Sequence, residues 1–273
     1  MLDDDDSAPP AGLDDDGRPE VLVVVPARGG SKSIPRKNIR LLAGHPLVAY
    51  SIATAHAARC VTRVIVSTDD AEIAAVARDY GAEVPFVRPG ELARDETPDL
   101  PVFVHALRWL GEAQGYRPDV VVHLRPTCPL CRPEWVDQAV EMLRSHPAAD
   151  SVRSVAPPWH TPYKMWRIDP ATGLLSPLLT VPGLAEPYNS PRQVLPECWW
   201  QTGHVDAVRP ATILSRGSMT GTAIMPLRVD PQYAVDIDTA MDWAMAETQV
   251  RSGTLDVVVP RRAQPAPKPS EAA

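Results

Sequence analysis

The sequence predicts an α/β fold built on a mostly parallel sheet, and two patterns support this. Apolar strands alternate with helical segments from about residue 20 to residue 156, which is typical of parallel sheets. The strands at 21–25, 64–66 and 120–124 are apolar almost throughout, as expected where helices cover both faces of a sheet. A chain of 273 residues can hold one such core together with an insertion.

The expected elements follow in order along the chain. Strands are predicted at 20–25, 61–67, 83–87, 118–124 and 150–156, with helices at about 45–58, 70–79, 99–113 and 133–145. From Pro157 to about Gln201 the alternation gives way to a segment dense in Pro, Trp and Tyr. This segment predicts an insertion that acts as a substrate lid or a subunit contact. A strand near 222–229, the segment 233–238 and a helix at about 239–251 close the core.

The chain is thus expected to divide into five parts. Residues 20–156 form the α/β core, 157–209 the insertion and 210–255 the return to the core. Residues 1–19 and 256–273 are rich in small, polar and proline residues. They are predicted to be disordered tails, because they carry too little apolar surface to offset the entropy lost on ordering.

Composition excludes several classes of protein. The net charge is -7, but residues 1–19 hold seven Asp against one Arg, so the remaining chain is too close to neutral to attract nucleic acid through a global field. The sequence contains no run of about 18 apolar residues, which is the length that a membrane-spanning helix requires. The first residues do not form a secretory signal, and the four cysteines do not form a disulfide framework, so we expect a cytoplasmic protein.

The first strand runs directly into a glycine-rich basic loop at 26–38. Gly29 and Gly30 allow backbone N–H groups to approach an anion, at the end of a parallel strand where open α/β sheets bind ligands. The loop also carries the cations Arg28, Lys32, Arg36 and Lys37. It matches neither the Walker A pattern nor Gly-x-Gly-x-x-Gly. We interpret it as a polyphosphate site, with an ordinary basic surface loop as the alternative.

A second candidate is Asp236-Ile237-Asp238, which lies just before the last helix. In an extended chain the two carboxylates share a face and are separated by about 6.5 Å of rise, so both can reach one cation. Mg²⁺ is typically bound by one or two carboxylates together with substrate phosphates. A metal site is one interpretation of the pair, and a helix cap at Asp238 is the other.

Polar residues follow other strands at the same predicted edge. Arg125 and Thr127 come after the strand at 118–124 and offer a cation and a hydroxyl to a ligand, unless they form a simple turn. Arg88 is placed either to reach a phosphate or to remain solvated. Asp69 or Asp70 is expected to cap the next helix.

The insertion contains groups that suit an anionic, hydroxyl-rich molecule. Lysine and arginine pair with carboxylates, and amide side chains recognise hydroxyls. The alternative for these residues is packing within the insertion. The candidate substrate-binding residues are Lys164, Tyr188, Arg192, Gln193, Gln201 and Thr202.

Together these motifs resemble the acylneuraminate cytidylyltransferase family, which makes CMP-activated sialic and related nonulosonic acids. The resemblance spans about residues 20 to 250. It rests on Pro-Ala-Arg-Gly-Gly-Ser-Lys-Ser-Ile-Pro-Arg-Lys-Asn-Ile at the first strand, Ser-Thr-Asp-Asp after the second, Arg-Pro-Thr-Cys-Pro-Leu, Pro-Arg-Gln and Asp-Ile-Asp-Thr.

The resemblance implies a Rossmann-like nucleotidyltransferase sheet with an inserted dimerisation segment, and hence a homodimer. The implied reaction is attack of a hydroxyl of an acidic sugar on the α-phosphorus of CTP, with pyrophosphate leaving. Arg28 and Lys37 would neutralise charge, and Asp236 with Asp238 would hold Mg²⁺. No side chain stands out as a general base. The nucleotide-binding residues would be Ala27, Arg28, Gly29, Gly30, Ser31, Lys32, Lys37, Asn38, Arg88, Arg125 and Thr127.

The chain departs from the family pattern in the part expected to contact the acceptor. Cys128 stands where Ser is usual, Cys131 where Arg is frequent, and Gln201-Thr202-Gly203 where Asn-Gly is common. These departures indicate an acidic acceptor that need not be N-acetylneuraminate. The alternatives are a nucleotidyltransferase that uses another NTP or a sugar-phosphate or phosphonate acceptor, and a nucleotide-binding protein without turnover.

Overall fold

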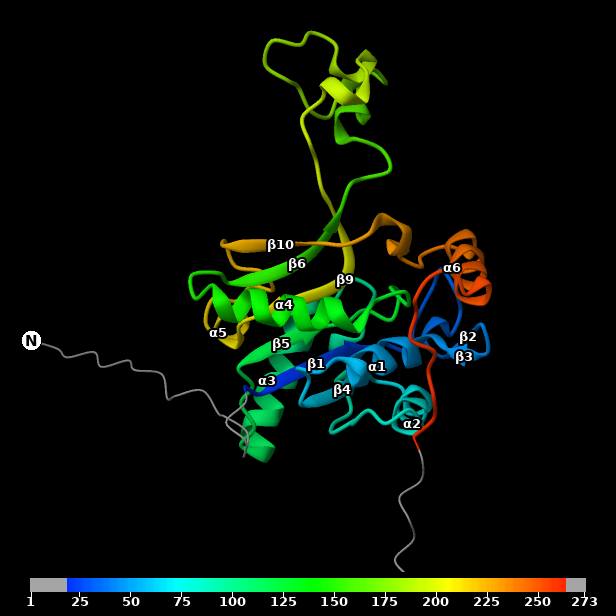
Figure 1. Cartoon of the computed structure of the whole chain (residues 1–273), viewed down its shortest axis with the longest axis vertical. Helices are drawn as coiled ribbons and strands as arrows, with labels where there is room; N and C mark the ends of the chain where they lie inside the picture. Colours follow the sequence, from blue (N-terminus) through cyan, green and yellow to red (C-terminus); the bar gives the residue numbers. More distant parts are fainter. Residues whose placement is uncertain (1–18, 264–273) are drawn as a thin grey trace, which may run out of the picture.

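The centre of the molecule is a six-stranded sheet in the order β10-β6-β9-β5-β1-β4, seen in a computed structural model that describes residues 19–263 (Figure 1). Its strands are β1 (Val21–Pro26), β4 (Arg63–Ser67), β5 (Val120–His123), β6 (Ser151–Ala156), β9 (Trp200–Val208) and β10 (Ile224–Arg228). β1 pairs in parallel with β4 and β5, and β10 pairs in parallel with β6. The predicted, mostly parallel α/β sheet is confirmed.

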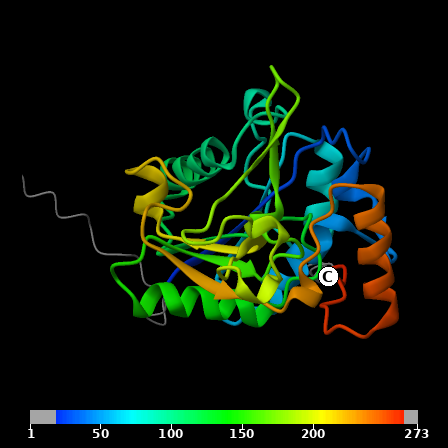
Figure 2. The same ribbon diagram turned by 90° about the horizontal axis from the view of Figure 1, so that it is seen from above.

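Helices cover both faces of this sheet. The helices are α1 (Leu47–Ala57), α2 (Ala71–Asp79), α3 (Asp99–Gln114), α4 (Pro133–Ser145), α5 (Pro210–Leu214) and α6 (Ala240–Ser252). The helices α1, α2, α4 and α6 pack into one apolar cluster, and α3 and α5 into a second. Figure 2 shows α3 and α4 on opposite sides of the sheet. None of the described helices is long and apolar enough to cross a bilayer.

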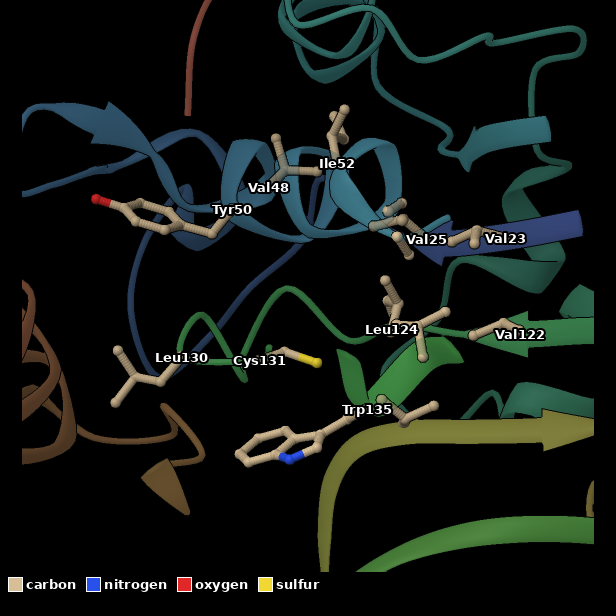
Figure 3. Close-up of a cluster of buried hydrophobic side chains, with 14 of the residues drawn as sticks. Val23, Val25, Val48, Tyr50, Ile52, Val122, Leu124, Leu130, Cys131 and Trp135 are labelled. Carbon is tan, nitrogen blue, oxygen red and sulfur yellow. The ribbon is translucent and has the colours of Figure 1, made fainter. Parts of the chain in front are cut away.

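The two clusters explain why the strands are apolar almost throughout. In β1, Val23 and Val25 face α1 and α4, whereas Leu22 and Val24 pack with the cluster that contains Phe103 of α3. Figure 3 shows the first of these clusters, where valines of β1 and β5 meet apolar side chains of α1 and α4. Both faces of β1 are buried, so every position of this strand from Val21 to Val25 is apolar.

The segment at 83–87 does not form the predicted strand. Glu83 makes a single bridge to Ile65, in which its N–H donates to the carbonyl of Val64 and its carbonyl accepts from Val66. Pro85 is the next residue that would face β4 in a ladder, and it has no N–H to donate. The pairing therefore stops after one residue.

The strand β9 was placed by the sequence within the insertion at 157–209, but it lies in the middle of the main sheet. It is antiparallel to both β5 and β6. The chain reaches it from the far end of the insertion, and it therefore enters the sheet in the opposite direction. Residues 157–199 form the part that leaves the sheet, and we call this part the arm.

The arm projects beyond the body from the ends of β6 and β9 (Figure 1). It contains a short hairpin of β7 (Trp166–Ile168) and β8 (Leu175–Pro177). A second hairpin, β2 (Leu41–Leu42) with β3 (His45–Pro46), lies next to α6. Several apolar side chains of the arm face solvent, among them Ile168, Leu174 and Leu175, each at least 60% exposed.

Residues 256–263 do not behave as part of a disordered tail. The N–H of Ala263 donates to the carbonyl of Asp79 over 2.8 Å, and Val257 packs against the main core. The apolar residues at 257–260 can pack against the core, although the segment 256–273 as a whole is rich in small, polar and proline residues. The remaining predicted tail residues, 1–18 and 264–273, lie outside the described residues.

Candidate active site

A cleft opens at the carboxyl ends of β1 and β5, beside the first turn of α3. Nine of the residues proposed from the sequence line this cleft. They are Arg28, Ser31, Lys32, Lys37, Asn38, Arg88, Arg125, Thr127 and Asp238. Residues from opposite ends of the sequence therefore meet at the edge of the sheet where parallel strands end, which is the usual ligand-binding edge of such folds.

The loop at 26–38 is held in place by hydrogen bonds from neighbouring segments. The N–H of Ala27 donates to the carbonyl of Ser67, and that of Gly29 donates to Oδ1 of Asp69 over 3.0 Å. The amide of Asn38 is buried and donates to the carbonyl of Arg28 over 2.9 Å. Asn38 thus fixes the shape of the loop in which the cations are carried.

Arg36 does not bring charge to the cleft, contrary to the expectation from the sequence. Its guanidinium donates to Asp70 and to Glu72, each at 2.5 Å, and so lies against the start of α2. The backbone of Arg36 is left-handed, with φ of 56°, which is uncommon for a residue other than glycine. Asp70 caps α2, as expected, by accepting from the N–H groups of Glu72 and Ile73.

We expect Asp70→Ala to lower the free energy of unfolding by about 1–2 kcal/mol, because it removes a helix cap and a partner of Arg36. The Arg36 guanidinium holds the pKa of the Asp70 carboxyl below its usual value. A lowered carboxyl pKa stabilises the fold above the unfolded value of about 3.9, and this stabilisation is lost as the pH falls through the folded pKa. Urea unfolding of both proteins between pH 3 and pH 7 measures it. A stability difference that grows toward acid would contradict the assignment.

The two glycines of the loop should differ in their tolerance of a side chain. A Cβ at Gly29 would lie 2.7 Å from Oδ2 of Asp70, whereas one at Gly30 would meet nothing within 4 Å. Asp70 is held by α2 and Arg36 and cannot easily move aside. We expect Gly29→Ala to cost about 1–3 kcal/mol of stability, with Gly30→Ala close to wild type. Equal effects in thermal unfolding would contradict this packing.

Arg28 and Lys32 meet on a single carboxylate. Nη1 of Arg28 donates to Oδ1 of Asp95 at 2.6 Å, and Nζ of Lys32 pairs with the other oxygen of the same group. The two cations lower the pKa of Asp95, with Lys32 the larger cause. A phosphate entering the cleft would compete with this carboxylate for both cations, because phosphate oxygens bind the same donors.

Lys37 joins the loop to the acidic pair near the end of the chain. Its Nζ donates to the carbonyl of Ile237 at 2.8 Å and to Oδ1 of Asp238 at 3.3 Å. The Lys37 side chain is only 12% exposed, so this ammonium is fixed between the two segments. Figure 1 shows the corresponding arrangement of the ribbon, with α6 beside the blue segment that contains the loop.

Asp236 and Asp238 have different surroundings. The carboxylate of Asp238 is 74% exposed and lines the cleft. Burial raises the pKa of Asp236, and a hydrogen bond from the hydroxyl of Thr127 opposes that shift. Thr239, and not Asp238, caps α6, in a capping box with Asp242. The helix therefore does not use the carboxylate of Asp238, which removes the alternative role considered from the sequence.

Arg88 is buried and is not the solvated side chain that the sequence allowed. It lines the cleft while its Nε donates to Oγ of Ser67 at 3.1 Å, and its Nη2 to the carbonyl of the same residue. Burial lowers the pKa of Arg88 to about 10, and the charge of Asp69 opposes this shift. Arg88 thus places a positive charge at the end of β4, on the wall of the cleft.

Four of the six proposed acceptor-binding residues lie on the arm and do not line the cleft of the same chain. Arg192 and Gln193 border a separate pocket at the base of the arm, and Tyr188 packs on Trp166 with 4.4 Å between ring centroids. Lys164 lies in the same region as Tyr188, where its turn contacts that of Tyr188. These residues could contact a ligand in a cleft only if the arm moved or if the cleft belonged to a second copy of the chain.

The remaining two acceptor-binding candidates lie in β9, where alternate residues face opposite sides. Thr202 is 1% exposed and donates to Oγ of Ser154 at 3.0 Å, so it is part of the core. Gln201 is exposed, and its Oε1 accepts from Nη1 of Arg153 at 2.9 Å.

Several polar residues at the site had no role in the sequence interpretation. The cleft also includes Asp95, Asp99 and His123. Burial lowers the pKa of His123 well below its usual value, which favours the neutral imidazole. A histidine at the end of an otherwise apolar strand was the signal in the sequence for this position.

The sequence matches a family of known proteins. The model of a cytidylyltransferase family matches residues 22–164. The chain belongs to this family. The match covers the loop at 26–38 and the strands β1, β4, β5 and β6, and all residues that line the cleft except Asp238 lie within it.

Characterised relatives extend the similarity beyond that segment. A CMP-N,N'-diacetyllegionaminic acid synthase of Legionella pneumophila is 35% identical over 228 residues, which are 83% of this chain and 94% of that protein. An N-acylneuraminate cytidylyltransferase of Oncorhynchus mykiss is 32% identical over 84% of this chain and 50% of its own length. A pseudaminic acid cytidylyltransferase of Campylobacter jejuni is 42% identical over 44% of this chain and 51% of its own.

The fold is shared with a solved structure of CMP:2-keto-3-deoxy-manno-octonic acid synthetase complexed with CTP. The TM-score is 0.62 at 16% identity, and the match covers 85% of this chain and 99% of the other. The fold is therefore that of a Rossmann-like nucleotidyltransferase, as the sequence resemblance implied.

Proposed function

We propose that this protein transfers CMP from CTP to a hydroxyl of an acidic sugar of the sialic or nonulosonic acid class, with release of pyrophosphate. The observation that carries the proposal is the contact of Lys37 with Ile237 and Asp238. It brings the basic loop and the acidic pair together at one cleft, in a chain whose relatives are CMP-sugar synthetases.

The cations of the loop support a triphosphate as the ligand. Arg28 and Lys32 exchange the carboxylate of Asp95 for phosphate oxygens, and Lys37 places a third positive charge opposite them. Phosphoryl-type transfer needs mainly positioning and neutralisation of charge, and these three side chains supply both. We assign no general base to the acceptor hydroxyl.

The donors present fit Mg²⁺ as a cofactor. No group of three or more His, Cys, Asp or Glu side chains suited to a metal occurs within residues 19–263, so a metal here must complete its shell with other oxygen donors. Mg²⁺ does this, because it is commonly held by one or two carboxylates and by substrate phosphates. Asp236 and Asp238 would hold the ion, which when bound would neutralise phosphate charge. Both carboxylates are oriented before the ion arrives, Asp236 by Thr127 and Asp238 by Lys37.

The arm supports a homodimer. It exposes Ile168, Leu174 and Leu175, whose burial against a second copy would be favourable. Such a contact would also give the arm residues Lys164 and Arg192 a route to a cleft. We propose that the protein works in the cytoplasm, in keeping with its four free cysteines.

A panel of nucleotides and acceptors tests the proposal. Pyrophosphate release would be measured with each of the four NTPs and with a set of sialic and nonulosonic acids, sugar phosphates and phosphonates, in the presence of Mg²⁺. We expect release with CTP and an acidic sugar only. Release with a purine nucleotide but not CTP would reject the cytidine assignment, and binding of CTP without release under any condition would indicate a protein that binds but does not turn over.

A further inference from the structure

A row of charged side chains crosses the sheet on the face covered by α3. In the strand register His123 of β5 is opposite Asp206 of β9, which is opposite Arg153 of β6. On β1 the corresponding face carries Leu22 and Val24, which pack under α3. The change from apolar to charged residues occurs where the sheet extends beyond that helix.

Asp206 holds two arginines on one buried carboxylate. Its side chain is 2% exposed, and it accepts from Nη2 of Arg125 at 2.9 Å. It also accepts from Nε and Nη2 of Arg153 at 2.9 and 3.2 Å. A buried carboxylate is costly unless its oxygens are fully paired, and here one group orients two guanidiniums at a fixed spacing.

The charges of this cluster are close to balance. Asp206 and Asp99 both accept from Arg125, the second over 3.5 Å, and Asp206 also accepts from Arg153. Asp99 is 44% exposed, so solvent screens its charge more than that of the buried Asp206. A monoanion would therefore be accepted here more readily than a dianion, which the two carboxylates would repel.

The arginines also keep donors free. Arg153 uses its Nε, one N–H of Nη2 and one of Nη1, which donates to Gln201. Arg125 donates from Nη1 to the carbonyl of Gly203 and from Nη2 to Asp206 and, over 3.5 Å, to Asp99. Each guanidinium has five N–H donors, so both retain groups for a ligand. Their side chains are 19% and 23% exposed, which leaves them accessible.

The position of the pair relative to the nucleotide loop indicates which substrate it would meet. Arg125 lines the cleft, and Arg153 lies two strands farther from β1, away from the loop at 26–38. Gln201 is exposed beside Arg153, and Trp199 lies on the same side, stacked on Arg228 at 4.7 Å. The guanidinium of Arg153 could therefore bind an acid group, the amide of Gln201 a hydroxyl and the indole of Trp199 the face of a sugar ring. These three groups lie on the side of the cleft away from the loop at 26–38.

We propose that Arg153 and Arg125 bind the carboxylate of the acceptor, and that Asp206 is the positioning residue that sets their geometry. This assignment rests on the proposed cytidylyltransferase function. The planar fork of arginine matches a carboxylate, and the neighbouring carboxylates Asp99 and Asp206 disfavour the higher charge of a phosphate or phosphonate dianion. The sequence interpretation placed Arg125 with the nucleotide, and this assignment moves it to the acceptor.

The experiment compares the best acidic acceptor from the nucleotide panel with its methyl ester. We expect wild type to prefer the acid, and Arg153→Gln to raise the KM for the acid by about 10- to 100-fold with the KM for CTP unchanged. The same variant should use the ester as well as wild type does. Arg153→Lys, which keeps the charge but not the fork, should be intermediate. Arg144→Gln, on α4 at the opposite face, is the control and should match wild type.

Asp206→Asn tests the positioning role, with folding checked by circular dichroism. We expect a raised KM for the acid and a reduced preference over the ester, and Arg153→Gln answers the question alone if this variant does not fold. An unchanged KM for the acid in Arg153→Gln would overturn the subsite while leaving the cytidylyltransferase function intact. Failure of every acid to support pyrophosphate release in wild type would instead reject the function, and the subsite with it.

Discussion

Asp238→Asn is expected to lower kcat by about 10²- to 10³-fold while CTP still binds in the absence of metal. The Asp238 carboxylate is 74% exposed, lines the cleft and caps no helix, so its loss removes a ligand for a cation without removing packing. Stability should change by no more than about 0.5 kcal/mol. Steady-state kinetics over a range of Mg²⁺ concentrations, with calorimetric titration of CTP, measures both effects.

Asp256→Asn is the matched control for this variant. Asp256 is 81% exposed, its carboxylate pairs with Arg132 at 3.4 Å, and neither residue lines the cleft. It should retain wild-type kinetics. Wild-type turnover in Asp238→Asn, at every Mg²⁺ concentration, would remove the metal role of the acidic pair.

Lys37→Met is expected to weaken CTP binding and to lower kcat/KM by about 10²- to 10³-fold. The methionine keeps most of the volume of the side chain but cannot donate to Ile237 or pair with Asp238. Lys37→Arg should recover only part of the activity, because the 12% exposed ammonium leaves little room for the wider guanidinium. Kinetics and CTP titration of the three proteins provide the measurement.

A methionine variant with unchanged kcat/KM would show that the contact between Lys37 and Asp238 serves only structure. A fall in stability alone, with CTP affinity preserved in the folded fraction, would lead to the same conclusion. Thermal unfolding of each variant therefore accompanies the kinetics.

The sequence was sufficient to predict the α/β class and nine of the residues that line the cleft. The valines of β1 indicated a strand buried on both faces, and Gly29 and Gly30 at its end indicated an anion site. The acidic pair was predicted from its spacing and from the loop. Its contact with Lys37, across 200 residues, had to be seen in the structure.

Features that depend on pairing between distant segments were missed. Arg36 was counted with the phosphate cations, but Asp70 and Glu72 draw it to α2. The direction of β9 depends on the path of the arm, which no local pattern encodes. The pairing of Asp206 with Arg153 depends in turn on the register of β9, and a strand pattern alone shows neither partner.

A crystal structure of the protein with CTP and Mn²⁺ in place of Mg²⁺ tests the central claim most directly. We expect the anomalous signal of one Mn²⁺ ion in contact with an oxygen of the acidic pair Asp236 and Asp238 and with a phosphate oxygen of CTP. Lys37 should lie beside the same triphosphate. An ion bound to the nucleotide but out of reach of both carboxylates, or a triphosphate held away from the loop at 26–38, would contradict the account.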